Sequence, residues 1–236
     1  MEEPPLSDSQ LGVRYYEKMM DDKRHVGRPE FFNAAAHVLA CPGRSTDHIY
    51  IFLHIEDSEI KAAGWQCHMC DPWMQIAGDI VCGLAEGMRT EEILQLTLED
   101  FEDELGGSDY VIAHHTGAAT LVAYKAALDF EVKIAIKSDL EEKVTPKSQM
   151  SDLGYTGREG MLRIKRLIEG RFSGDGLKIP RARLESVCAN GTVQDFSTLV
   201  QDLIERKAID IVKANGLGFP RSFDEAMEES DGQQES

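Results

Sequence analysis

Residues 47–70 read DHIYIFLHIEDSEIKAAGWQCHMC, and this stretch decides the fold. Residues 47–55 are rich in β-branched and aromatic side chains, which favour strands. A period of two, typical of a strand with one buried face, is set by Ile49, Ile51, Leu53 and Ile55. A turn at 56–58 then predicts an antiparallel partner strand over 59–65. The sequence therefore predicts a small antiparallel sheet at this point.

A Cys-x-x-Cys motif follows, where the second strand should hand over to a helix. Its thiols belong to Cys67 and Cys70. Two thiolates three residues apart at a helix start can face one bound ion or cluster, and first-turn N–H groups favour their deprotonated form. Cys41 lies upstream and the pair His114 and His115 lies downstream. These side chains are candidates for one metal or sulfur site.

Composition limits the classes of partner. The 236 residues suffice for one large domain or two modest ones, and 42% of them are hydrophobic. A net charge of −17 argues against nucleic acid or an anionic membrane as partner, since both require a basic face. No apolar run is long enough for a membrane span, and the acidic start MEEPP does not resemble a signal peptide. We expect a cytoplasmic protein.

The cysteine count points to metal or sulfur chemistry. There are five cysteines, an odd number, and four of them lie within residues 41–82 among histidines. This pattern suits a reducing cytosol and a metal or sulfur site better than a disulfide framework. Cys82 falls on the apolar face of a predicted helix and is expected to be a core residue.

Helical periodicity and breaker residues divide the rest of the chain. Helices are expected over 11–20, 72–86, 90–98 and 114–128, with an acidic loop over 99–109. Residues 31–41 fit either a strand or a short helix. We expect five segments, namely a flexible lead (1–10), a first domain (11–136), a linker (137–152), a smaller helical domain (153–218) and an acidic disordered tail (219–236).

Several motifs occur in a fixed order along residues 10–130. They are YYEKMMD and RHVG within 15–27, an Asp-led strand at 47, GWQC at 64–67, GMRTEEI at 87–93 and HHTGAA at 114–119. Together they resemble the IscU/NifU-type iron–sulfur cluster assembly scaffolds. The resemblance implies an α+β fold, with helices on one face of a small antiparallel sheet and a cluster site at one end.

The same resemblance implies a ligand set. Cys41 and Cys67 match the family's first two ligand cysteines, and His115 stands where the third would be. The strand pattern places Asp47 at the family's aspartate, after an insertion, while Cys70 is an additional thiol. The candidate ligands are Cys41, Asp47, Cys67, Cys70, His114 and His115. Thiolates and imidazole suit either a [2Fe–2S] cluster or one tetrahedral zinc ion, and the sequence does not choose between them.

The sequence also departs from the family pattern. The Leu-Pro-Pro-Val-Lys segment that binds the dedicated chaperone is replaced by Ser-Asp-Tyr-Val-Ile at 108–112. The cysteine-rich domains of long NifU proteins are absent, because the C-terminal half contains only Cys188. The expected helical domain resembles nothing that we can name.

Three functions are consistent with these residues. The first is a scaffold or carrier for iron–sulfur cluster assembly, which implies a cysteine desulfurase and cluster acceptor proteins as partners, with a homodimer as one candidate assembly. The second is a zinc-dependent sulfur-transfer protein that accepts persulfide from a cysteine desulfurase. The third is a specialised relative with a permanent metal cofactor. Whether the chain is an enzyme is left open.

Overall fold

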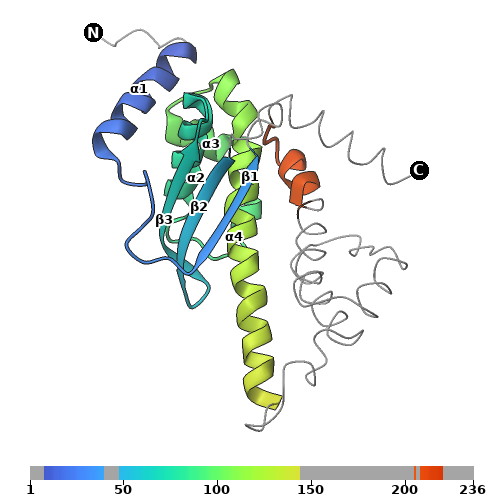
Figure 1. Cartoon of the computed structure of the whole chain (residues 1–236). Coiled ribbons are helices and arrows are strands. Elements are labelled where there is room, and N and C mark those ends of the chain that lie inside the picture. The colour runs from blue at the N-terminus through green and yellow to red at the C-terminus, as the bar shows by residue number, and fades with distance from the viewer. Residues whose placement is uncertain (1–7, 40–47, 144–204, 206–207, 220–236) are drawn as a thin grey trace, which may run out of the picture. The chain divides into compact units, whose positions relative to one another are not determined.

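A three-stranded antiparallel sheet with helices on one face is the centre of the computed structural model (Figure 1). The structure describes residues 8–39, 48–143, 205 and 208–219. Its elements are α1 (Asp8–Asp22), β1 (Ala34–Leu39), β2 (His48–Glu56), β3 (Glu59–His68), α2 (Pro72–Ala85), the 3-10 helix η1 (Ile93–Gln95), α3 (Leu98–Leu105) and α4 (Tyr110–Lys143). The predicted α+β fold class is confirmed.

The sheet follows the order β1-β2-β3, and the alternation within β2 behaves as predicted. All four alternating residues of β2 are buried, namely Ile49, Ile51, Leu53 and Ile55. The antiparallel register pairs Ile51 with Trp65 and Ile49 with Cys67. Residues 31–41, which the sequence left undecided, contain strand β1. Because paired residues share a face of the sheet, Cys67 belongs to the same face as the buried Trp65.

Helix α2 covers this face of the sheet. It starts at Pro72, and the side chain of Asp71 caps it by accepting a hydrogen bond from the Met74 amide at 2.9 Å. A Cβ atom on Gly78 would lie 2.9 Å from Cδ1 of Ile49, so glycine permits the close approach of helix and strand. Cys82, on the same helix, is fully buried, as expected.

The prediction for residues 90–109 was wrong in both of its parts. The expected helix over 90–98 is reduced to the short η1, and the expected loop over 99–109 contains α3. Thr97 and Asp100 form a capping box that starts α3, and Phe101 is buried within it. The abundant acidic side chains therefore concealed an amphipathic helix.

Helix α4 is longer than the sequence indicated at both ends. It begins at Tyr110 instead of residue 114, because the Asp109 carboxylate accepts hydrogen bonds from the Val111 and Ile112 amides. It continues to Lys143, beyond the expected domain boundary at 136. Residues 137–143 contain neither glycine nor proline, so nothing in them interrupts a helix.

The structure divides into two compact units, one formed by Met1–Ala127 with Ala208–Ser236 and the other by Leu128–Lys207. Residues 208–218, which the sequence assigned to a separate helical domain, pack within the first unit. The Gly218 N–H donates to the Ala113 carbonyl at 3.2 Å, and the Gly218 carbonyl accepts from the Gly117 amide at 2.8 Å. Gly218 therefore binds two backbone groups of α4. Asn215 donates to the Leu94 carbonyl at 2.6 Å.

Most of the other predicted segments lie in parts of the chain that the structure does not describe. Residues 1–7, most of the expected helical domain and residues 220–236 of the tail lie outside the described residues. Within the described ranges, no helix combines the length and apolarity needed to cross a membrane.

Gly64 in β3 offers a test of this packing. A Cβ atom there would lie 2.5 Å from the Gly27 carbonyl oxygen, which is backbone and has little freedom to move. We expect Gly64→Ala to lower the free energy of unfolding by about 1–3 kcal/mol in urea denaturation.

Gly83→Ala is the matched control, because its nearest contact would be His25 Cε1 at 3.4 Å, an ordinary distance. Within helix α2 this change should raise stability by about 0.5–1 kcal/mol. Equal effects of the two substitutions would contradict the packing described here.

Candidate functional site

Cys67 and Cys70 meet at the end of β3. The structure joins their sulfur atoms in a disulfide, with the Cα atoms 5.8 Å apart, inside the range that disulfides span. The turn between them passes through Met69, whose φ is +67° and whose side chain is 66% exposed. The two thiols that the sequence predicted as ligands are thus brought together.

His115 of α4 is linked to this turn through one carboxylate. Its Nδ1 lies 2.8 Å from the Val111 carbonyl oxygen, and its Nε2 lies 3.5 Å from Oδ2 of Asp71. Because a carbonyl oxygen can only accept, Nδ1 carries the proton of this hydrogen bond. Asp71 directly follows Cys70 in the chain. The imidazole and the disulfide turn therefore share a common anchor.

The electrostatics of Asp71 favour its charged form. Burial opposes ionisation of this carboxyl, but the hydrogen bond from His115 and the Met74 amide outweigh burial and hold the pKa of Asp71 below its usual value. Asp71 was not among the predicted site residues. Its position immediately before a proline at a helix start was the signal that could have identified it as a cap.

The remaining predicted ligands are His114, Cys41 and Asp47. His114 makes an edge-to-face ring contact with the exposed Tyr110, at 4.4 Å between centroids. Cys41 and Asp47 lie outside the described residues. Among the residues that are described, no three Cys, His, Asp or Glu side chains are arranged to hold a metal ion. The described donors form two pairs, Cys67 with Cys70 and Asp71 with His115.

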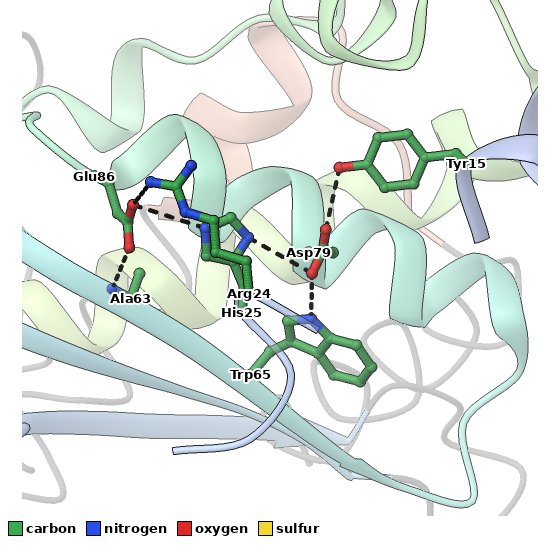
Figure 2. Close-up of polar contacts among 7 residues, drawn as sticks. All are labelled: Tyr15, Arg24, His25, Ala63, Trp65, Asp79 and Glu86. Carbon is green, nitrogen blue, oxygen red and sulfur yellow. Dashed lines mark hydrogen bonds and ion pairs between the residues drawn. The ribbon is translucent and has the colours of Figure 1, made fainter. Parts of the chain in front are cut away.

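A buried polar cluster supports β3 from the α2 side (Figure 2). His25 lies between two carboxylates, with Nδ1 3.6 Å from Asp79 and Nε2 3.7 Å from Glu86. Asp79 also accepts hydrogen bonds from the Trp65 indole at 3.0 Å and from the Tyr15 hydroxyl at 3.2 Å. The cluster connects α1, the segment after it, β3 and α2.

Glu86 extends the same cluster toward solvent. It binds Arg24 at 2.6 Å and accepts from the Ala63 amide at 3.2 Å. The backbone completes the connection, since the Trp65 amide donates to the His25 carbonyl and the Gly27 amide donates to the Trp65 carbonyl. Trp65 stands two residues before Cys67. RHVG belongs to a motif that the sequence shows, but nothing in its local pattern indicates that its histidine is buried.

Burial and the charges of Asp79 and Glu86 shift the pKa values of side chains in this cluster. Burial disfavours the imidazolium form of His25, but Asp79 and Glu86 outweigh burial and raise the pKa of His25 despite the opposing charge of Arg24. Burial, reinforced by Asp79, also raises the pKa of Tyr15. Burial, again with both carboxylates, raises the pKa of the Cys82 thiol, which is therefore unreactive compared with an exposed cysteine.

No family model and no curated protein matches this chain. Among solved structures, it is similar to a nitrogen-fixing NifU-like protein (N-terminal) from Brucella abortus, with 15% sequence identity and a TM-score of 0.31. The match covers 58% of this chain and 100% of that chain.

The charge of His25 predicts a pH-dependent stability. A histidine whose pKa is higher in the folded state stabilises the fold fully below its unfolded pKa of about 6.5, and this contribution is lost as pH rises through the folded pKa. Urea titrations from pH 5 to 9 should show this decline for the wild type, and His25→Gln should reduce it.

His54→Gln, a change on strand β2 outside the cluster, should leave the contribution of His25 to this decline in place. If His25→Gln leaves the decline intact, the assigned charge of the buried imidazole is wrong.

Proposed function

We propose that this chain is a scaffold or carrier for iron–sulfur cluster assembly and that it binds the cluster through Cys67, Cys70 and His115. One observation carries the proposal. The sulfur atoms of Cys67 and Cys70 meet at the end of β3, and the next residue, Asp71, connects this turn to His115. Support for the proposal comes from the two soft donors at the end of β3 and the contact that links their turn to an imidazole on α4.

The chemistry of these donors supports the proposal. Thiolates are the usual ligands of iron–sulfur clusters, and imidazole replaces thiolate in some of them. Histidine ligands typically donate their second ring N–H to a carbonyl or carboxylate, as Nδ1 of His115 does to the Val111 carbonyl. That hydrogen bond leaves Nε2 as the nitrogen for a metal, and Asp71 would have to give way to it.

The cluster in this proposal is cargo, and it requires the reduced protein. Cysteine binds iron as a thiolate and not as a disulfide, so the Cys67–Cys70 disulfide must first open. Cys41 is the proposed additional thiolate and Asp47 the proposed carboxylate ligand. A carboxylate binds soft iron–sulfur clusters less strongly than a thiolate does, which suits a cluster that must leave. A cysteine desulfurase, cluster acceptors and a homodimer stay predictions from the family resemblance.

Zinc is the second candidate, favoured by the contact between Asp71 and His115. Zinc accepts carboxylate oxygen as well as thiolate and imidazole, so Cys67, Cys70 and His115 would supply three ligands of a tetrahedral site and the neighbouring Asp71 carboxylate the fourth. In that case the protein would hold a zinc-bound thiol that accepts persulfide sulfur. Quantification of metal and acid-labile sulfide, described next, separates the two candidates.

Metal and acid-labile sulfide should be quantified on the full chain purified without oxygen and in the presence of a dithiol reductant. We expect iron and sulfide in about equal amounts, with visible charge-transfer absorption. Cys67→Ala should lose at least about 90% of both, because a cluster binds through such thiolates.

Cys82→Ala is the matched control, because this thiol is fully buried in α2 and should leave the content unchanged. About one zinc per chain without sulfide would identify the zinc candidate. Iron and sulfide that do not depend on Cys67 would refute the proposed site.

A further inference from the structure

We infer that Cys67 and Cys70 also act as a two-electron donor that releases sulfide from sulfane sulfur. The basis is their contact in the structure, where the two sulfur atoms are joined and the Cα separation of 5.8 Å accommodates the bond. A dithiol that can close in this way is a two-electron reductant.

The surroundings suit an incoming sulfur donor. Both cysteines are partly exposed, and the turn between them presents the 66% exposed Met69 to solvent. Cys82, the remaining cysteine in the part of the chain that the structure describes, is completely buried in α2. Among the described cysteines, the pair at the end of β3 is the one that an external donor can reach.

The proposed reaction takes sulfur from a persulfide, R–S–SH. One thiolate of the pair attacks the outer sulfur, the S–S bond of the donor breaks, and R–SH leaves. The partner thiolate then attacks the cysteine sulfur that carries the new persulfide, which forms the Cys67–Cys70 disulfide and expels HS⁻. In sum, two thiols and R–S–SH give one disulfide, R–SH and H₂S. The sulfane sulfur gains two electrons, and the two cysteine sulfurs lose one each.

This activity deepens the proposed function and rests on it for the use of the product. Bridging sulfur in a cluster is sulfide, whereas sulfur delivered as persulfide is more oxidised by two electrons. The pair would supply those electrons at the position where the cluster is proposed to bind. A dithiol reductant must then reopen the disulfide before each new cycle, so that both sulfurs become available as ligands.

The test uses the full chain, reduced, desalted without oxygen and free of iron, with glutathione persulfide as the probe. We expect release of about one sulfide per chain and loss of two protein thiols. The tryptic peptide 62–89 contains Cys67, Cys70 and Cys82, so after alkylation its mass locates the new disulfide. It should carry one alkyl group, on Cys82.

Cys67→Ser and Cys70→Ser should each reduce sulfide release to the level measured without protein, whereas Cys82→Ala should match the wild type. Circular dichroism establishes that each variant is folded. Sulfide release by either serine variant at the wild-type level, or a disulfide that involves Cys41, would overturn the inference.

A second arm supplies the persulfide on a cysteine desulfurase with free cysteine. Release from this arm alone would identify a protein-bound donor, and release from both arms a donor that includes small persulfides. Release from neither arm would overturn the inference.

Reconstitution with ferrous iron and inorganic sulfide separates this inference from the proposed function, because it needs no persulfide. A cluster that forms there, without sulfide release from persulfide, refutes only the reductant role. Sulfide release without a cluster upholds the reductant role and refutes the scaffold.

Discussion

The position of Trp65 is the constraint on which the site depends. Its backbone pairs with His25 and Gly27, its indole donates to the buried Asp79, and its register partner in the sheet is the fully buried Ile51. These contacts place the end of β3 between the segment after α1 and helix α2. Cys67 follows two residues later, so the location of the first thiol is set by packing and not by the exposed turn itself.

The second half of the site depends on how helices begin. Asp71 caps α2 and contacts His115, so a residue that starts one helix also orients a side chain on another. Gly218 joins Ala113 to Gly117 on α4, and His115 lies between these two residues in the chain. A segment near the C-terminus therefore supports the helix that carries the imidazole. Sulfur, carboxylate and imidazole groups reach one region from separate parts of the sequence.

Local patterns were sufficient to predict the sheet but not the whole site. The alternation from Ile49 to Ile55 reports a buried face directly, and the Cys-x-x-Cys spacing brought two thiols together without any tertiary contact. Helix α3 was missed because its acidic residues masked a capping box and the buried Phe101. The burial of His25 depends on carboxylates more than 50 residues away in sequence, and the Gly218 contacts span about 100 residues. The hydrophobic periodicity of a sequence cannot indicate contacts between residues so far apart. Cys41 and Asp47 stay predictions.

The most direct test of the central claim is metal K-edge X-ray absorption on the reduced, reconstituted full chain. The account predicts sulfur neighbours at about 2.3 Å together with a nitrogen at about 2.0 Å, distances known for thiolate and imidazole at zinc and close to those expected for iron. His115→Ala should remove the imidazole scattering, and Cys67→Ala should reduce the sulfur contribution. A metal surrounded by oxygen and nitrogen alone, with a spectrum that neither substitution changes, would contradict the claim that these residues form the site.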